Sequence, residues 1–157
     1  MLSLLPVLVL AGCASPDKSA RSAEIMATGQ ASLENYTSRG LKTTRIFALK
    51  IDGELLQAKW KKGVYSLSSG LHEVRIICQF SRFSFGDLVI DAGDVTLRFE
   101  AEPKTRYRIL GQKLSETAAE IWIENVMTGV AVTSRLAVQL NANPQNIPII
   151  IPIPIRR

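Results

Sequence analysis

The sequence is poor in the side chains that most often carry catalysis or bind transition metals. It contains one histidine, His72, and two cysteines, Cys13 and Cys78. A zinc site takes four nitrogen or sulfur ligands, or three with a water, so we expect no metal site. The chain also lacks a Gly-x-Ser-x-Gly motif, and a catalytic His72 would need a nucleophile and an orienting acid beside it. We therefore expect no enzyme and no cofactor, with a hydrolase as the remote alternative, and a structural His72 that forms a hydrogen bond within a turn.

Acidic residues gather at two places, and neither has the spacing of a known site. Asp87, Asp91 and Asp94 lie around a glycine, but the spacing and the final glutamate of a calcium-binding EF-hand are absent. Glu100 and Glu102 share a predicted strand face and could mimic the carboxylate pair of a glycosidase. Turn aspartates and exposed glutamates explain both groups, and that is what we predict.

No apolar run in the N-terminal region is long enough to cross a membrane as a helix. The run from Leu2 to Leu10 falls short of the roughly 20 residues that a spanning helix needs, but it suits the apolar segment of a signal peptide. It ends in Leu10-Ala11-Gly12-Cys13, and the small residues Ala14 and Ser15 follow. Signal peptides normally begin with Lys or Arg, whereas residues 1–12 carry no charged side chain.

This segment resembles the signal of bacterial lipoproteins, in which an apolar run ends in small residues and one cysteine. The resemblance implies that residues 1–12 are removed and that Cys13 becomes the first residue, diacylated on its sulfur and acylated on its amine. In enterobacterial lipoproteins an aspartate after the cysteine favours retention in the inner membrane, and Ala14 stands there instead. The resemblance therefore implies a lipid anchor in the outer membrane, on its periplasmic face.

The second cysteine has no partner if the first is acylated. Cys78 then forms no disulfide within the chain. A lone thiol in an oxidising compartment survives best when it is buried. The alternation of residues 72–80 places Cys78 on the apolar face of a strand, so we expect it in the core.

The composition suits one domain with a tether. Residues 13–42 are polar and rich in Ser, Ala and Thr, which predicts a flexible, lipidated tether with a possible short helix at Ala23 to Ala27. The net charge of +5 favours anionic surfaces such as lipid head groups or cell-wall polymer, although we expect it mainly to aid solubility. Nucleic acid is not an expected partner, because an exported lipoprotein rarely meets it.

The sequence pattern of residues 43–140 predicts one all-β domain. Short apolar runs alternate with turn residues such as Asp52-Gly53, a pattern typical of a small antiparallel β-sandwich with seven or eight short strands. The first strand is predicted to direct Phe47, Leu49 and Ile51 inward, residues 91–94 to form a turn, and residues 115–119 to form a possible helix. The predicted strands are Ile46–Ile51, Val64–Leu67, His72–Phe80, Val95–Ala101, Arg106–Leu110, Glu120–Asn125, Val130–Thr133 and Leu136–Leu140, with Phe83–Ile90 as a strand or loop.

The C-terminal residues 141–157 form a separate segment rich in proline and isoleucine. Proline lacks a backbone donor, so Pro144, Pro148, Pro152 and Pro154 exclude a central strand. An exposed run of this apolarity would invite aggregation. We expect the segment to pack along its own domain, with an arm for a partner as the alternative.

A series of turn and strand motifs runs through the predicted domain. The motifs are Ile51-Asp52-Gly53, Ser69-Gly70-Leu71-His72-Glu73-Val74, Phe99-Glu100-Ala101, Thr105-Arg106-Tyr107, and Trp122-Ile123-Glu124-Asn125 with Thr128-Gly129. Over residues 46–132 the series resembles a recurrent group of small bacterial lipoproteins of unknown function, with the turn-and-strand pattern of PEGA-like sandwich domains. Those proteins often have proline where Ser69 stands. The resemblance implies a β-sandwich in the cell envelope and brings no catalytic residue.

The first candidate surface is the segment Lys59-Trp60-Lys61-Lys62. A tryptophan among lysines suits a membrane interface, an anionic polymer, or a sugar that stacks on the ring. The alternative is a charged hairpin in which Trp60 folds back on the core and the lysines are solvated.

The second candidate surface is formed by Arg98, Arg106 and Arg108. These arginines fall on the polar faces of predicted neighbouring strands and could form a basic patch. Pairing across strands with Glu100 or Glu102 would explain them equally well.

These features predict a membrane-anchored periplasmic lipoprotein that binds a partner and does not transform a substrate. The first hypothesis is a scaffold module that docks on another cell-envelope protein through an edge strand, the C-terminal segment or the basic face. The alternative is a module that binds peptidoglycan or another glycan through Trp60 and its lysines.

Overall fold

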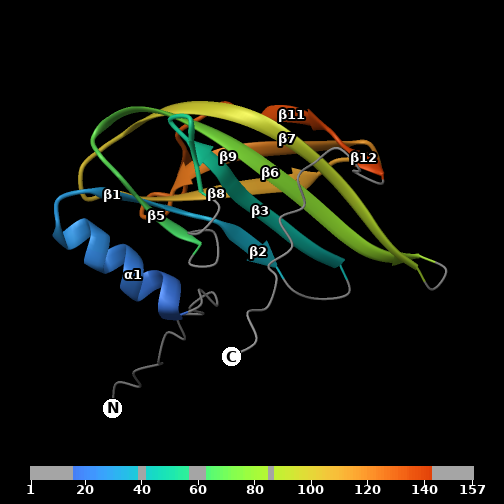
Figure 1. The fold of residues 1–157 in the computed structure, drawn as a ribbon, viewed down its shortest axis with the longest axis horizontal. Helices are drawn as coiled ribbons and strands as arrows, with labels where there is room; N and C mark the ends of the chain where they lie inside the picture. The colour runs from blue at the N-terminus through green and yellow to red at the C-terminus, as the bar shows by residue number, and fades with distance from the viewer. Residues whose placement is uncertain (1–15, 39–41, 57–62, 85–86, 143–157) are drawn as a thin grey trace, which may run out of the picture.

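In the described residues, two six-stranded sheets pack face to face with one helix outside them (Figure 1). The computed structural model describes residues 16–38, 42–56, 63–84 and 87–142. The helix is α1 (Pro16–Ala27). Sheet A contains β1 (Ala31–Glu34), β5 (Val64–Leu67), β8 (Arg106–Lys113), β9 (Ala118–Asn125), β10 (Val130–Ala131) and β11 (Leu136–Gln139). Sheet B contains β2 (Tyr36–Ser38), β3 (Lys42–Ile51), β4 (Glu54–Leu55), β6 (Gly70–Ser84), β7 (Asp87–Ala101) and β12 (Asn141–Ala142).

The predicted all-β sandwich is confirmed, with more strands than expected. Twelve strands lie in the described residues, and four of them have only two or three residues. Sheet A has the order β10-β9-β8-β1-β5, with β11 also on β9, and sheet B has the order β12-β7-β6-β3-β2, with β4 on β3. The pairing of β1 with β8 is parallel and the other pairings described here are antiparallel, so sheet A is mixed.

The core lies between the two sheets and follows the period-two pattern of the strands. Sheet A contributes alternate residues of β8 and β9, among them Tyr107 and Ile121, which are fully buried. Sheet B contributes the alternate residues Val74, Ile76, Cys78 and Phe80 of β6. Cys78 is therefore buried in the core, as predicted. Burial of these apolar side chains, at about 25 cal/mol per Å² removed from water, is the main source of stability.

Leu49 is buried as expected, but the predicted inward direction of Phe47 is wrong because β3 contains a bulge. Its register with β6 shifts between Ala48 and Lys50. Ile46 and Ala48 therefore point into the core ahead of the bulge, while Phe47 is only half-buried. Ile51, beyond the bulge, packs against the core as expected. One extra residue reverses the alternation of all residues on one side of it.

The predicted turn at residues 91–94 is also wrong, because β7 runs through them without interruption. Gly93 lies opposite Cys78 in this strand. A Cβ atom there would lie 2.5 Å from the carbonyl oxygen of Gln139 and 2.6 Å from the Val138 side chain. The glycine therefore serves the close approach of a neighbouring segment and not a turn. The possible helix at residues 115–119 is likewise wrong, since a bend leads there into β9.

The flexible tether predicted for residues 13–42 is wrong for the part that the structure describes. Residues 16–38 form α1, β1 and β2, and α1 lies on the outer side of sheet A beside β1 and β5 (Figure 1). The four residues of β1 are all buried, because α1 covers one face of this strand and sheet B covers the other. A strand buried on both faces shows no alternation, so the sequence pattern did not reveal it.

Residues 1–15 and 143–157 lie outside the part of the chain that the structure describes. Within the described residues, no helix is long and apolar enough to span a membrane. Cys13 and the C-terminal residues 143–157 lie outside the described residues, so the predictions made for them remain predictions. The last described strand, β12, pairs Ala142 with Asp91 of β7.

Candidate functional site

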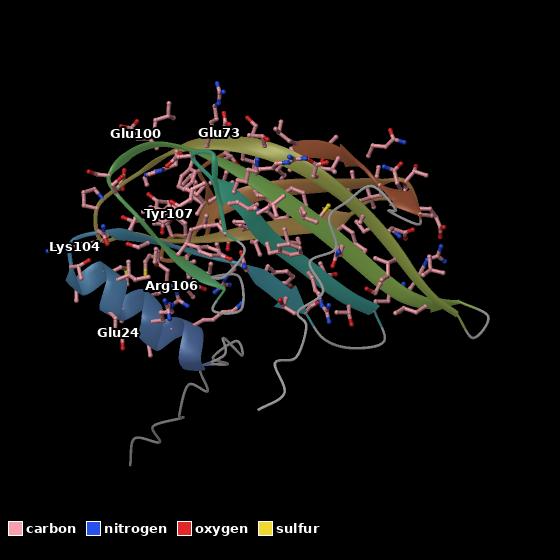
Figure 2. The ribbon with its side chains drawn as sticks, viewed as in Figure 1. Glu24, Glu73, Glu100, Lys104, Arg106 and Tyr107 are labelled. Atoms are coloured by element: carbon pink, nitrogen blue, oxygen red, sulfur yellow. The ribbon has the colours of Figure 1, made fainter. Side chains whose placement is uncertain are left out.

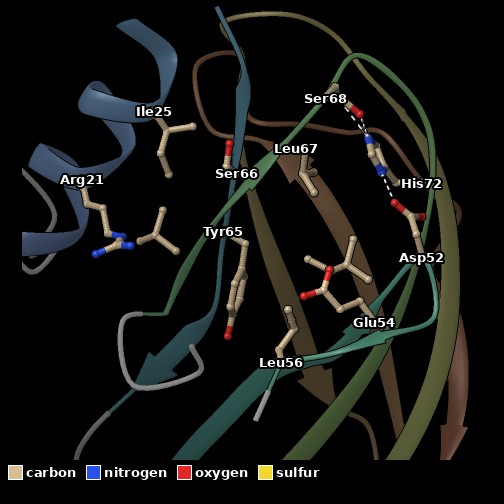
Figure 3. Close-up of a pocket in the computed structure, with 12 residues that line it drawn as sticks. Arg21, Ile25, Asp52, Glu54, Leu56, Tyr65, Ser66, Leu67, Ser68 and His72 are labelled. Atoms are coloured by element: carbon tan, nitrogen blue, oxygen red, sulfur yellow. Dashed lines mark hydrogen bonds and ion pairs between the residues drawn. The ribbon is translucent and has the colours of Figure 1, made fainter. Parts of the chain in front are cut away.

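The arrangement that most resembles a catalytic site is the contact of His72 with Asp52 and Ser68 (Figure 3). His72 Nδ1 lies 2.6 Å from Asp52 Oδ2, and Nε2 lies 3.5 Å from Ser68 Oγ. The turn at Asp52-Gly53 directs Asp52 to this point, and Gly53 adopts a φ of 82° there. Ser68 comes from the turn between β5 and β6, and His72 is a buried residue of β6.

The geometry does not make His72 a general base for Ser68. Nε2 lies only 2.9 Å from the backbone carbonyl oxygen of Ser68, which accepts a hydrogen bond from it. A carbonyl oxygen can only accept, so the hydrogen on Nε2 is directed to it and no lone pair of that nitrogen faces the Ser68 hydroxyl. His72 therefore joins two turns, and the predicted turn hydrogen bond is confirmed.

The carboxyl of Asp52 contacts both the His72 ring and the backbone N–H of Glu73. Burial raises the pKa of Asp52, but the backbone N–H of Glu73 and the His72 ring together outweigh this effect, so the pKa lies below its ordinary value. A carboxylate stabilised in this way strengthens the link between the β3–β4 turn and β6 near neutral pH.

A cavity of about 430 Å³ lies beside this contact, between α1 and the strands β4 and β5 (Figure 3). Its wall is mixed: Ile25, Leu56 and Leu67 are apolar, whereas Arg21, Glu54 and His72 are polar or charged. The volume falls at the lower end of the range for small-molecule pockets. The described wall alone identifies no ligand.

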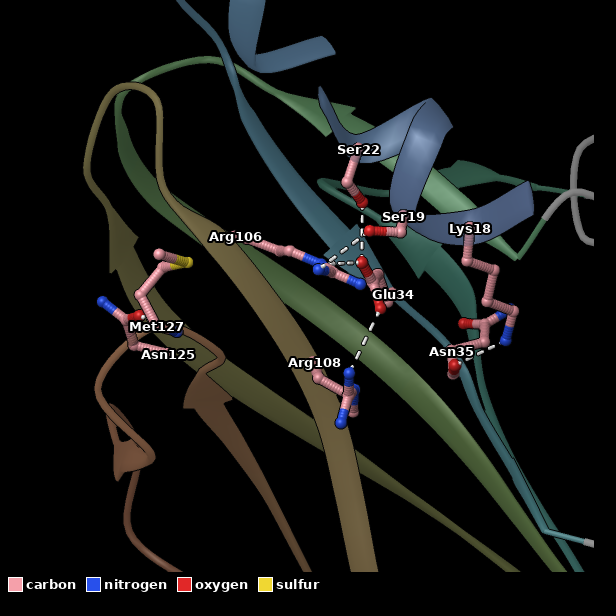
Figure 4. A network of polar contacts seen from close by, with 9 residues as sticks. All are labelled: Lys18, Ser19, Ser22, Glu34, Asn35, Arg106, Arg108, Asn125 and Met127. Atoms are coloured by element: carbon pink, nitrogen blue, oxygen red, sulfur yellow. Dashed lines mark hydrogen bonds and ion pairs between the residues drawn. The ribbon is translucent and has the colours of Figure 1, made fainter. Parts of the chain in front are cut away.

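A buried network of charged and polar residues surrounds Glu34 (Figure 4). Glu34 is 2% exposed, and its Oε1 accepts hydrogen bonds from Ser22 Oγ at 2.6 Å and from Arg106 Nε. Its Oε2 forms an ion pair with Arg108 at 3.7 Å. The network joins α1, β1 and β8, so it fastens the helix to sheet A.

Sequence reasoning missed Glu34 and its neighbour Asn35. Asn35 donates a hydrogen bond to Tyr65 Oη at 2.9 Å and accepts one from the backbone N–H of Ala48 at 3.0 Å. Its carbonyl accepts from Lys18 Nζ at 2.9 Å. Burial lowers the pKa of Lys18 below its ordinary value, although the nearby Glu34 opposes the effect. The only sequence signal was a carboxylate beside small and apolar residues at positions 31–34.

The structure does not bring the three predicted arginines together. Arg98 lies on β7 of sheet B, where it is exposed and bound to Glu73 at 2.6 Å. Arg106 and Arg108 lie on β8 of sheet A and share Glu34. The predicted basic patch of all three is therefore wrong, and so are the expected partners Glu100 and Glu102. The remaining candidates, Lys59 to Lys62, lie outside the described residues; the segment precedes Gly63, whose carbonyl accepts the Asn35 N–H.

The predicted turn aspartates belong to a strand. Asp91 is buried in β7 and its Oδ2 lies 2.5 Å from Lys113 Nζ, with Arg82 Nε at 3.9 Å. Lys113 and Arg82 also line a groove of about 840 Å³ whose apolar part includes Phe80 and Leu114. The described residues contain no group of three potential metal ligands.

The thiol of Cys78 is shielded. Burial raises the pKa of Cys78 to about 11, and the thiol donates weakly to the Gly93 carbonyl at 3.5 Å. A neutral, buried thiol is a poor nucleophile. We therefore assign Cys78 a packing role.

Apolar side chains are exposed along the edge of sheet A formed by β10 and β11. Val130 is 61% exposed and Leu136 is 40% exposed, and Met127 in the adjoining turn is 76% exposed. Leu136 lies opposite Ile121 of β9 in register. Opposed residues of an antiparallel pair point to the same face of the sheet, so the core-facing side of β9 continues into uncovered apolar residues at the edge.

The comparisons with known proteins identify no family for this chain. No family model, no curated protein and no solved structure matches the chain. The resemblance to lipoproteins with PEGA-like domains thus stays a prediction.

Proposed function

We propose that this chain is a lipid-anchored protein of the outer membrane whose periplasmic sandwich docks on another cell-envelope protein. The proposal has two parts, an anchor and a docking edge. The anchor rests on the apolar run that ends at Leu10-Ala11-Gly12-Cys13. The acyl chains on Cys13 would hold the protein durably, since each buried methylene contributes about 0.8 kcal/mol and two or more chains act together.

The observation that carries docking is the apolar edge of sheet A. Val130 and Leu136 extend the inner face of the sheet beyond the cover of sheet B and remain exposed. β10 has only two residues and no further strand on its outer side in the described fold. An edge of this kind offers backbone groups to another strand and apolar side chains to its pockets. An extended segment of a partner protein satisfies both requirements.

The anchor is tested by metabolic labelling with a palmitate analogue in a bacterial host. We expect the full-length chain to carry the label and to sediment with membranes. Cys13→Ser should lose both properties. Cys78→Ser should keep the label, because Cys78 is buried in the core and is not part of the signal segment. An unlabelled wild-type chain would refute the anchor.

The docking edge is tested by placing a photo-crosslinking amino acid at Val130 in cells. We expect one dominant envelope protein to be captured, and capture to be lost when Leu136→Asp is added. The matched control is the same crosslinker at Leu88, which is 55% exposed on sheet B. Equal capture at both positions would contradict a specific edge. Binding to purified cell wall that depends on Trp60 would instead favour the glycan-binding alternative.

A further inference from the structure

The first helix begins very close to the proposed lipid anchor. α1 starts at Pro16, and only Ala14 and Ser15 separate it from Cys13. A chain extends by at most about 3.3–3.6 Å per residue, so Cys13 and Pro16 are never more than roughly 11 Å apart. The lipid is therefore attached to the helix by a short linker (the leash), which consists of Ala14 and Ser15, whatever path these two residues take.

The helix is itself fixed to the sandwich near its first two turns. Ser22 donates to the buried Glu34, and Lys18 Nζ donates to the carbonyl of Asn35. The Lys18 side chain also packs against Gly63, where a Cβ atom would lie 3.1 Å from Lys18 Cε. These contacts tie α1 to β1 and to the start of β5, so the position of the helix sets the position of both sheets.

The leash is short compared with the domain. A domain of 100 residues has a radius of gyration of about 13 Å, which corresponds to a sphere roughly 34 Å across. A leash of about 11 Å lets such a body rock, but not turn its far side to the membrane. The end of the sandwich that carries the first turn of α1 must then lie next to the lipid surface.

We propose that this end, formed by the first turns of α1 with Lys18, Asn35 and Gly63, rests on the lipid head groups around the acylated Cys13. The inference relies on the lipid anchor of the proposed function and deepens it. The surface suits the role, because Ser19 and Ala20, which are exposed in the described part of the first turns, are small. Lys18 uses one of its three donors on Asn35 and has others for phosphate oxygens.

The orientation leaves the opposite side of the molecule free. Figure 2 shows Glu24 on α1 on one side, and Glu73 and Glu100 across both sheets on the other. The outer face of sheet B would thus point away from the membrane, towards the periplasm.

The test uses the full-length acylated protein in vesicles of phosphatidylethanolamine and phosphatidylglycerol that contain lipids with a nitroxide on the head group. A fluorophore is attached to Ala20→Cys or, as the matched control, to Glu100→Cys; both positions are exposed. Cys78 does not compete for the label because it is fully buried. We expect the nitroxide to quench the fluorophore at position 20 several-fold more strongly than at position 100. Equal quenching, or stronger quenching at position 100, would overturn the proposal.

A longer leash provides the second variant. Inserting about twenty Gly and Ser residues between Ser15 and Pro16 adds a coil with a mean span of roughly 25 Å. We expect acylation to persist and the difference in quenching between the two positions to disappear. A difference that survives the insertion would overturn the role of the leash. The palmitate label on Cys13 is measured on the same preparations, so failure of the anchor is distinguished from failure of the orientation.

Discussion

Replacing Glu34 with glutamine is expected to destabilise the protein by about 3–5 kcal/mol. Glu34 is 2% exposed and receives Ser22, Arg106 and Arg108. Glutamine keeps the shape but removes the negative charge, which leaves two largely buried guanidinium groups without a counter-charge. Its amide would also present donors to donors.

The effect is measured by urea unfolding of the unacylated domain. Glu100→Gln is the matched control, because Glu100 is exposed on β7 and should change the unfolding free energy by less than about 0.5 kcal/mol. The double variant Glu34→Gln with Arg106→Gln should recover part of the loss, since it removes one of the uncompensated charges. A Glu34→Gln variant as stable as the wild type would show that the network adds no net stability.

The loss of stability in Glu34→Gln should appear first in α1. Ser22 and Glu34 join α1 to β1, so hydrogen exchange in residues 16–27 should speed up more than in β6 or β7. Uniform acceleration across the domain would mean that α1 is not a separate unit of stability. Under the proposed orientation, the same variant would also loosen the sandwich from its place beside the membrane.

Replacing Phe99 with alanine is expected to cost about 3–5 kcal/mol, the usual range for removing a buried aromatic ring. Phe99 lies in the core, with its ring centroid 5.0 Å from that of Tyr107 in an edge-on arrangement and 6.4 Å from that of His72. The Tyr107 hydroxyl accepts the backbone N–H of Glu102 at 2.9 Å. Loss of the Phe99 ring would therefore also loosen the turn between β7 and β8.

The matched control is Leu71→Ala. Leu71 lies on β6, the neighbouring strand, but is 74% exposed and should change stability by less than about 0.5 kcal/mol. Both variants are compared by thermal and urea unfolding under the same conditions. A small effect at Phe99 would mean that the surrounding side chains collapse into the vacated space.

Much of the sandwich was predictable because most strands bury one face and expose the other. Cys78 and Ile121 lie in the core as the alternation indicates, although Ile77 on the other face of β6 is buried as well. The elements that were missed break this rule for identifiable reasons. β1 is buried on both faces, β3 contains a bulge, and Gly93 makes room for Gln139 inside a continuous strand.

The candidate site was less predictable than the fold. His72 was expected to form a hydrogen bond in a turn, and it does, but its second partner Asp52 lies 20 residues earlier in the chain. Arg106 and Glu34 are 72 residues apart in sequence. Ion pairs of this kind depend on which strands become neighbours, and residue spacing along the chain carries no record of that.

The sequence by itself determined that this chain forms a β-sandwich with Cys78 in its core, because strand periodicity is a local property of the chain. It also supplied the lipoprotein-like segment at Cys13, on which the proposed anchor depends. Only the tertiary structure decided that residues 16–38 belong to the domain, that Arg98 and Arg106 lie on different sheets, and that apolar residues remain uncovered at the β10–β11 edge. The reason is that burial on both faces, charge pairing and edge exposure arise from contacts between distant segments, and these exist only once the two sheets and the helix have packed together.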